Sequence, residues 1–304
     1  MAAEAAEVVA VVVAAKDRFG LGWRPELSAS ILLNGGEIDI IEIVAENFLK
    51  DKKVSNSLKT LAAQIPITIH AVSLGLASSL PVEIHRLEKL AKLFDVITPS
   101  FWSEHLAFVR AGGYEIGHLA APPRNNETVE GTIRNIELAT KIIGLPPLME
   151  NIATLMNPPT SDMSESEWIS AIVSKTSAGL LLDLHNLYAN SINFNFNAKD
   201  FLLSLPLNKI AAVHLSGGKW VKNPKTDKMY LLDDHLHDVP EEVYGLLEFL
   251  ASICPNALSV IIERDGKYPL FDSMLSELRK ARQAVATGRE LQVQAFEESN
   301  YACG

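Results

Sequence analysis

Short, strongly apolar runs alternate with longer segments of helical periodicity along almost the whole chain. Ile38–Val44 and Ala178–Asp183 are largely apolar, which is typical of strands buried on both faces of a parallel sheet. The segments between such runs place apolar residues at helical spacing, as Thr128–Ile143 does. Eight units of this kind predict an α/β fold, the closed (β/α)8 TIM barrel. The expected strands are Phe19–Gly22, Ile38–Val44, Ile65–His70, Val96–Pro99, Pro147–Glu150, Ala178–Asp183, Lys209–His214 and Leu258–Glu263.

Helical patterns fill the gaps between these strands, and nothing in the sequence divides the chain. The helices are expected at Ser55–Gln64, Val82–Phe94, Thr128–Ile143, Ser164–Ser174, Pro240–Ile253 and from Leu270 onward. No stretch rich in Pro, Gly and Ser separates two halves. Residues 18–304 are therefore expected to form a single TIM-barrel domain, preceded by an Ala- and Val-rich extension over residues 1–17.

The charge balance and the cysteine content restrict the partners and the compartment. The 304 residues include 27 Lys and Arg against 37 Asp and Glu, a net charge of −10, which argues against a protein that grips nucleic-acid phosphates. The apolar run Val8–Ala15 is far shorter than the roughly 20 residues that span a bilayer, and it follows the acidic Glu4 and Glu7. Only Cys254 and Cys303 occur, so no disulfide framework is expected. The protein is predicted to be cytoplasmic, with neither nucleic acid nor membrane as a partner.

Residues able to bind a metal ion stand at the ends of successive expected strands. They are His70, Glu150, Asp183, His214 and Glu263, and His105 follows the fourth strand within a few residues. Neighbouring members of this series are 31 to 49 residues apart, close to one strand-and-helix unit each. Because the carboxyl ends of the strands of a (β/α)8 barrel meet at one face, these side chains are expected to converge in one cavity. Asp233 and His235 lie in the longest gap, in a loop able to fold over the same mouth.

The chemistry of such a set is metal binding, because imidazoles and carboxylates are ligands of divalent first-row metals. The eight residues exceed the about four to six ligands that one ion takes, so two or three ions with bridging carboxylates are expected. Cations would also remove the cost of burying so many acids together. Each residue has a structural alternative: Asp183 could cap a helix, and Glu263 could pair with Arg264. Their coincidence at one end of successive strands favours a metal centre.

Several longer motifs occur in the order in which one known family has them. They are Gly20–Glu26, Ala45–Phe48, His70–Leu74, Ser103–Phe108, Glu150-Asn151, Leu181–Tyr188, Val213–Gly217, Asp233–His235 with Val239-Pro240, and Ile262-Glu263. Over roughly Gly20 to Gly266, the chain resembles the multinuclear non-heme iron-dependent oxidative enzymes, a family that includes the catalytic subunit of methanobactin biosynthesis.

The resemblance implies a xylose-isomerase-like TIM barrel that holds two or three iron ions (Fe2+ and Fe3+) and uses O2 as co-substrate. The implied ligands are His70, His105, Glu150, Asp183, His214, Asp233, His235 and Glu263. Asp233 and His235 are also expected to take part in catalysis. Characterised members oxidise a residue, usually Cys, of a ribosomally synthesised peptide, and many require a small partner protein that presents the leader peptide.

Further residues beside these ligands are expected to complete the site. Glu46, Asn47 and Glu104 are candidates for orienting the ligands or for binding metal themselves. Ser73 lies in a loop of small residues after His70 and is expected to contact the substrate, as is Lys219.

His185 and Asn186 stand where the family often has two asparagines. As an imidazole, His185 either adds a metal ligand or changes the occupancy of one metal position. Asn186 is a candidate for ligation or for orienting a ligand.

Two other functions fit the same residues. A hydrolase or isomerase of the xylose-isomerase-like or endonuclease-type barrel group would use Zn2+ or Mn2+ as a Lewis acid. A non-catalytic barrel would only bind metal or a peptide. Imidazole and carboxylate ligands serve iron and zinc alike, so the ligands alone do not separate these functions.

Overall fold

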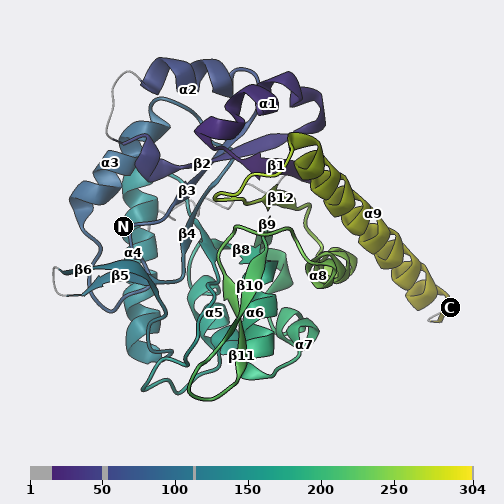
Figure 1. Ribbon diagram of the computed structural model, residues 1–304. Coiled ribbons are helices and arrows are strands. Elements are labelled where there is room, and N and C mark those ends of the chain that lie inside the picture. Colours follow the sequence, from purple (N-terminus) through teal and green to yellow (C-terminus); the bar gives the residue numbers. More distant parts are fainter. Residues whose placement is uncertain (1–15, 50–53, 112–113, 303–304) are drawn as a thin grey trace, which may run out of the picture.

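A closed barrel of eight parallel strands forms the centre of the protein. The computed structural model describes residues 16–49, 54–111 and 114–302 (Figure 1). In order around the barrel, the strands are β1 (Arg18–Gly22), β2 (Ile40–Val44), β3 (Ile67–Ala71), β4 (Trp102–His105), β7 (Leu148–Glu150), β8 (Gly179–Asp183), β9 (Ile210–Leu215) and β12 (Ser259–Ile262), which pairs again with β1. The predicted (β/α)8 fold is confirmed. Residues 1–15 of the predicted extension, and Cys303, lie outside the described residues.

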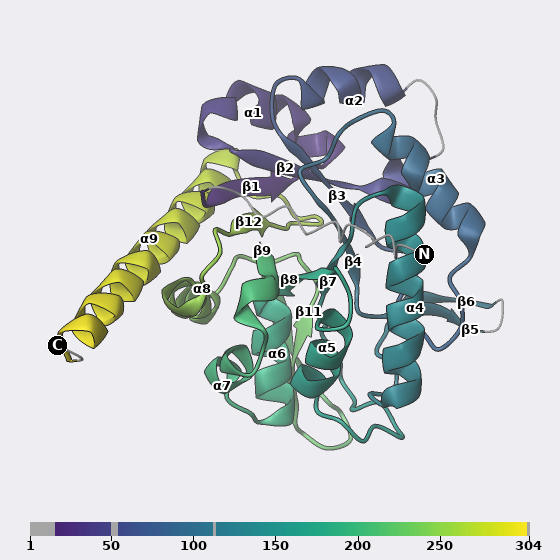
Figure 2. The same ribbon diagram turned by 180° about the vertical axis from the view of Figure 1, so that it is seen from behind.

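Helices cover the outside of this barrel (Figures 1 and 2). They are α1 (Ser28–Leu33), α2 (Val54–Ala62), α3 (Ile84–Phe94), α4 (Asn126–Ile143), α5 (Glu165–Val173), α6 (Leu184–Phe194), α7 (Ala198–Leu203), α8 (Glu241–Ile253) and α9 (Phe271–Ala302). The first part of α9 packs along α8, and its end extends beyond the body of the molecule (Figure 1). Among the described helices, none combines the length and apolar character needed to cross a membrane.

Local sequence signals fix where α4 begins and ends. The Asn125 side chain accepts a hydrogen bond from the N–H of Thr128, and the Thr128 side chain in turn bonds the N–H of Asn125. This reciprocal arrangement pairs two N–H groups that the first helical turn leaves unsatisfied. Gly144 ends the helix with a φ of 83°, in the left-handed region that glycine adopts at little cost. The Ser164 and Glu167 side chains form the same arrangement at the start of α5.

The alternation of side chains along each strand builds the barrel interior in two layers. The lower layer is an apolar floor that includes Ile40, Leu148, Leu181, Ala212 and Ile261. Two residues further along each of these strands stand Glu42, Glu150, Asp183, His214 and Glu263. Because residues i and i+2 of a strand face the same side, the floor lies directly beneath a layer of ionisable groups. The strand pattern therefore brings these groups together at the carboxyl-terminal face of the barrel.

The predicted strand at Val96–Pro99 is wrong, because the fourth barrel strand is β4 (Trp102–His105). Pro99 has no N–H to donate to a sheet, and Ile97 is buried in the connection after α3 instead. Within β4, Ser103, Glu104 and His105 are all polar. A strand whose side chains serve a polar site lacks the apolar run by which strands are recognised.

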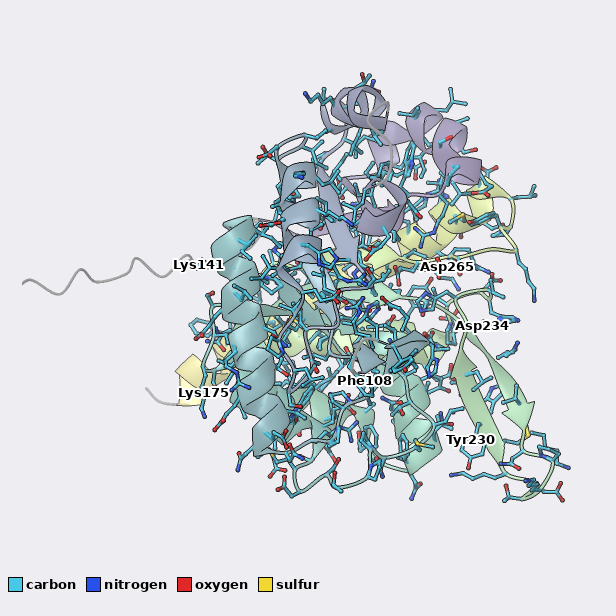
Figure 3. All side chains as sticks on the ribbon, turned by 90° about the vertical axis from the view of Figure 1, so that its left-hand side faces the viewer. Phe108, Lys141, Lys175, Tyr230, Asp234 and Asp265 are labelled. Atoms are coloured by element: carbon cyan, nitrogen blue, oxygen red, sulfur yellow. The ribbon has the colours of Figure 1, made fainter. Side chains whose placement is uncertain are left out.

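Two antiparallel hairpins, which the sequence did not predict, follow barrel strands β4 and β9. The first joins β5 (Phe108–Ala111) to β6 (Tyr114–Ala120), and the second joins β10 (Gly218–Lys222) to β11 (Met229–Asp233). Most side chains of β6 and β10 are at least partly exposed, so neither strand has a continuous apolar side. Figure 3 shows Tyr230 of β11 on an arm that projects beside the barrel. Helices α1, α6 and α7 were also not predicted. The buried side of α6 includes several Asn side chains and so lacks a continuous apolar stripe, and α1 and α7 are only six residues long.

Candidate metal centre

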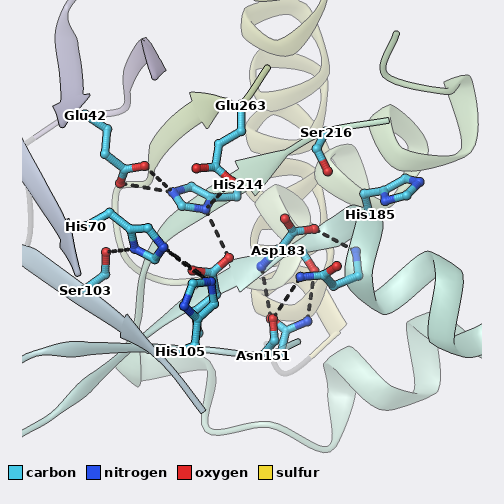
Figure 4. Close-up of polar contacts among 12 residues, drawn as sticks. Glu42, His70, Ser103, His105, Asn151, Asp183, His185, His214, Ser216 and Glu263 are labelled. Atoms are coloured by element: carbon cyan, nitrogen blue, oxygen red, sulfur yellow. Dashed lines mark hydrogen bonds and ion pairs between the residues drawn. The ribbon is translucent and has the colours of Figure 1, made fainter. Parts of the chain in front are cut away.

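His70, His105 and Glu150 converge from three adjacent strands, β3, β4 and β7. Figure 4 shows the rings of the two histidines next to each other. The Nε2 atoms of the two histidines are 3.3 Å apart, and Glu150 Oε2 lies 3.5 Å from His70 Nε2 and 3.6 Å from His105 Nε2. His70 Nδ1 lies 2.8 Å from Ser103 Oγ. When Nδ1 donates its proton to this hydroxyl, the Nε2 lone pair faces the other two groups. We call these three residues the first cluster.

Glu150 reaches a second cluster with its other oxygen. Glu150 Oε1 lies 3.1 Å from His214 Nδ1, and Glu263 Oε2 lies 3.2 Å from the same nitrogen. Asp183 completes this cluster, because each of the four residues offers one ligand atom within 4.8 Å of the others. A carboxylate shared in this way can bridge two neighbouring metal ions.

A third cluster forms where the β10–β11 hairpin returns to the barrel. His235 Nε2 lies 2.9 Å from Asp233 Oδ2 and 3.9 Å from Asp183 Oδ2, while His235 Nδ1 lies 3.4 Å from Glu263 Oε2. The loop predicted to fold over the mouth thus does so. His185 lies behind this cluster, with Nδ1 2.8 Å from Asp233 Oδ1. All eight residues that the sequence predicts as ligands therefore meet in one cavity.

Asp183 caps a helix, which is its structural alternative, and also belongs to the second cluster. Its Oδ1 accepts a hydrogen bond from the N–H of Asn186 at 2.7 Å and so caps α6. Its Oδ2 is buried without a hydrogen-bond partner among the described residues. The Asn186 amide donates to the carbonyl of Asn151, whose own amide donates to the carbonyl of Asp183 (Figure 4). Asn186 thus fixes the start of α6.

Glu263 does not form the ion pair with Arg264 that was its structural alternative. The guanidinium of Arg264 lies 2.5 Å from Asp238 Oδ1 and 3.7 Å from Glu277 Oε2. Glu263 instead faces His214 and His235, in the second and third clusters.

Several polar atoms of the cavity are buried without a hydrogen-bond partner among the described residues. They include Glu150 Oε2, Asp183 Oδ2, His105 Nδ1 and His235 Nε2. An unpaired polar atom of this kind costs about 1–3 kcal/mol, and more when it is charged. Cations between the clusters would satisfy the two carboxylate oxygens and His235 Nε2 together. The residues therefore fit metal ions, and their nitrogen and oxygen donors suit first-row metals.

The charges in the cavity shift the titration of its histidines in opposite directions. Burial lowers the pKa of His70 to about 3, so this ring is neutral. Burial also opposes the charged form of His105, but the combined attraction of Glu150, Glu104 and Glu263 outweighs it and raises the pKa of His105 to about 9. Nearby carboxylates likewise raise the pKa of His214 and His235 well above the ordinary value despite burial. Protons on three histidines thus supply positive charge that metal ions would otherwise bring, so protons and metal compete.

Glu42 is a buried acid of this centre that the sequence reasoning did not select. Its two carboxylate oxygens lie 3.0 and 3.1 Å from His214 Nε2 (Figure 4). Because Nδ1 of the same ring faces the second cluster, Glu42 accepts the Nε2 proton and leaves Nδ1 available to a metal ion. A signal was present, since Glu42 is the only ionisable residue of Ile40–Val44 and follows the floor residue Ile40 by two positions.

The residues expected to orient the ligands occupy different places. Glu104 is fully buried and accepts hydrogen bonds from the backbone N–H of His105 and from a backbone N–H of the loop after β3. Glu46 accepts a hydrogen bond of 2.6 Å from the Ser73 hydroxyl in the same loop. Both acids therefore hold this loop above the first cluster. Asn47 is exposed in the 3-10 turn Ala45–Asn47 and lies outside the three clusters.

A cavity of about 500 Å³ opens above the clusters, and His70, His105 and Ser73 line it. Arg24 and Asp265 also line it, two residues that the sequence reasoning did not select. Arg24 Nε lies 3.1 Å from Asp265 Oδ1.

Hairpin residues His118 and Leu119 line this cavity and also a second one of about 570 Å³, which Asp233 lines as well. Lys219 lies on β10, half-exposed, with Nζ 3.4 Å from Asp234 Oδ2. Figure 3 shows Asp234 and Asp265 on the same side of the molecule.

Comparison with known proteins finds relatives along most of the chain. Residues 18–286 match the family described as RiPP precursor modification enzyme MbnB/TglH/ChrH, where RiPP denotes a ribosomally synthesised and post-translationally modified peptide. A UPF0276 protein of Streptomyces avermitilis is 33% identical over 273 residues, which cover 88% of this chain and 54% of the relative. The chain thus spans about half the length of that relative. A UPF0276 protein of Caulobacter vibrioides is 28% identical over 275 residues, covering 90% of this chain and 96% of the relative.

A solved structure supports the fold alone. The xylose isomerase-like TIM barrel protein from Mycobacterium smegmatis in complex with magnesium has a TM-score of 0.52 and 10% sequence identity. It matches 90% of this chain and 98% of its own. The xylose-isomerase-like form of the barrel is therefore confirmed.

Proposed function

The chain belongs to the family of RiPP precursor modification enzymes MbnB/TglH/ChrH, and from this premise we propose that it is an O2-dependent oxidase with a multinuclear iron centre. Its substrate is a ribosomally synthesised peptide, of which it oxidises one residue, by preference a Cys. The observation that carries the proposal is the convergence of eight His, Asp and Glu side chains in three overlapping clusters. This set is larger than one ion takes, and its shared acids, Glu150, Asp183 and Glu263, suit two or three ions.

The predicted ligands differ in how deeply their side chains are buried. His70, Glu150, Asp183 and His214 are almost completely buried and would hold iron away from water. When bound, iron (Fe2+ and Fe3+) supplies the electron transfer by which O2 oxidises a peptide side chain, and it favours the thiolate form of a coordinated Cys.

Asp233 and His235 form the part of the centre nearest the substrate. Their side chains keep 17% and 16% of their surface exposed, against 3% or less for His70 and His214. A peptide entering the cavity therefore reaches Asp233 and His235 first, and this supports their catalytic role. If His235 Nε2 held iron, its Nδ1, which lies 3.4 Å from Glu263 Oε2 and from Asp265 Oδ2, would be the nitrogen able to exchange a proton with the substrate.

The peptide occupies the cavity above the clusters in this proposal. Ser73 lies at its wall, where the backbone of an extended peptide can approach the small side chains of the loop. Lys219 stands on the hairpin beside the mouth and contacts acidic or carbonyl groups of the peptide. A small partner protein presents the leader of the peptide, and the reaction takes place in the cytoplasm.

The test is to produce the chain in cells together with each short Cys-containing peptide encoded beside its gene, with and without any small protein encoded there. The iron-loaded protein should consume O2 and change the mass of one peptide at a Cys. The matched control is Glu150→Gln, which keeps the size of a shared ligand and removes its charge. Iron-loaded protein that neither consumes O2 nor changes any such peptide contradicts the proposal.

A further inference from the structure

His185 is a buried histidine whose contacts give it a role distinct from that of the other histidines. It is the second residue of α6, directly behind the third cluster, and its side chain is fully buried. Figure 4 shows its ring apart from the rings of His70, His105 and His214, on the far side of Asp183. It therefore approaches the centre from outside the ring of ligands.

The polar contacts of His185 lead to a single carboxylate oxygen. Its Nδ1 lies 2.8 Å from Asp233 Oδ1, and the Ser216 hydroxyl lies 3.3 Å from the same oxygen. The other oxygen of this acid, Asp233 Oδ2, lies 2.9 Å from His235 Nε2. A donor on Oδ1 thus fixes the rotation of the carboxylate and directs Oδ2 toward the third cluster.

The ring of His185 packs against the β10–β11 hairpin on the side away from Asp233. A Cβ placed on Gly218 would lie 2.5 Å from His185 Cε1 and 2.9 Å from its Nε2, so the ring packs directly against the hairpin backbone. Its Nε2 therefore points at the glycine and is buried without a hydrogen-bond partner among the described residues. Glycine at position 218 provides the space in which the ring fits.

Helix α6 also contacts the β10–β11 hairpin further from the metal centre. The Asn193 side chain accepts a hydrogen bond from the N–H of Leu231 at 3.0 Å and donates one to its carbonyl at 2.9 Å. Lys228 Nζ donates to the Asn193 carbonyl at 2.8 Å. Helix α6 is thus the platform on which β11 lies, and His185 is its contact nearest to the metal centre.

We propose that His185 is a positioning residue rather than a metal ligand. Its Nδ1–H donates to Asp233 Oδ1 and holds Asp233 Oδ2 toward Asp183 and His235, so that the third cluster binds its ion. The first and second clusters do not depend on this contact, because their residues come from the barrel strands. The inference rests on the proposed metal centre.

Two substitutions separate the positioning role from ligation. In His185→Asn, the side-chain amide nitrogen stands at the same branch of the side chain as Nδ1 and can still donate to Asp233. In His185→Leu, the size is similar but no donor remains. Positioning predicts that asparagine replaces histidine and leucine does not. Ligation by the imidazole predicts that both variants lose metal.

The experiment is anaerobic titration with Fe2+ of the wild type, His185→Asn, His185→Leu and Ser216→Ala, with bound iron counted after removal of free metal. The wild type and His185→Asn should bind the same number of ions with similar affinity. His185→Leu should bind one ion about 10–100-fold less tightly and keep the others. Ser216→Ala, which removes only the longer bond to Asp233, should lose less than His185→Leu. The retained ions of the first two clusters also report that the leucine variant is folded, and His185→Ala gives the same comparison if it is not.

The outcomes distinguish this inference from the proposed function. Wild-type affinity for every ion in His185→Leu overturns the positioning role, as does a loss in His185→Asn equal to that in His185→Leu. A wild-type chain that binds no iron overturns the metal centre itself and this inference with it.

Discussion

Glu42 offers a sharp test of how the barrel prepares a metal ligand. Its carboxylate lies 3.0 Å from His214 Nε2, and both side chains are almost completely buried. Replacing Glu42 with leucine keeps the size of the side chain but removes the carboxylate that, among the described residues, accepts this N–H. The ring then loses the contact that fixes which nitrogen carries the proton and which faces the second cluster. Metal binding at the second cluster should weaken.

The magnitude follows from the kind of hydrogen bond that is lost. A hydrogen bond to a charged group contributes about 1.5–3 kcal/mol, and each 1.4 kcal/mol is about tenfold in affinity. Loss of an acceptor behind a metal-binding histidine costs about 10–100-fold in metal affinity, which is the same range. Glu42→Leu should therefore weaken the ion bound by His214 by about that factor. Glu42→Gln keeps an acceptor without the charge, so its loss should be smaller, about tenfold or less.

The assay is competitive metal titration of wild type, Glu42→Gln and Glu42→Leu, with thermal unfolding of each chain as the control for folding. We expect the metal affinity to fall in the order wild type, Glu42→Gln, Glu42→Leu. Equal affinity in all three folded proteins would refute the role assigned to Glu42. A loss in Gln as large as in Leu would show that the charge matters and the orientation of the ring does not.

Three further predictions follow from the same geometry. Glu150→Ala should remove more bound metal than His70→Ala, because Glu150 faces two clusters; equal losses, measured by elemental analysis, would contradict its bridging position. Metal affinity should fall as the pH is lowered. The pKa of His105 is about 9 in the metal-free protein, so metal binding displaces a proton from this ring at any pH below that value. His70 has a pKa of about 3, so it stays neutral and adds nothing to the pH dependence. Competition titrations between about pH 8 and pH 6 should show a dissociation constant about tenfold higher per pH unit for each displaced proton, and a flat profile would contradict this. Gly20→Ala should lower the free energy of unfolding by about 1–3 kcal/mol or more in urea denaturation, because its Cβ would lie 1.9 Å from the Ile40 carbonyl oxygen, and an unchanged midpoint would contradict the close approach of β1 and β2.

The fold is largely predictable because most barrel strands keep an apolar run. Strands such as β8 (Gly179–Asp183) are buried on both faces and read as continuous apolar segments. The exception, β4, carries Ser103, Glu104 and His105, because its side chains belong to the site and to the loop above it. Because these residues are polar, the strand that carries them lacks the apolar run from which the other strands are predicted.

The candidate ligands are predictable for a related reason, since a barrel fixes which end of each strand bears the site. Glu42, which orients the ligand His214, is the residue of the centre that was missed, because the register of β2 is not known from the sequence. Glu42 lies two residues before the end of β2, so the strand-end criterion passes over it, although its neighbour at i−2, Ile40, belongs to the apolar floor. The hairpin that delivers Asp233 depends on contacts with Asn193 of α6, which spacing along the chain does not reveal. Long-range packing of this kind appears only in the structure.

The multinuclear iron centre is tested most directly by the number and identity of the metal ions in the anaerobically purified protein. Elemental analysis with Mössbauer spectra should find two or more irons per chain in mixed oxidation states, and fewer in His70→Ala and Glu263→Ala. Stoichiometric zinc or manganese with negligible iron, even after growth in iron-rich medium, would contradict the iron oxidase and favour a hydrolase or isomerase that uses its metal as a Lewis acid.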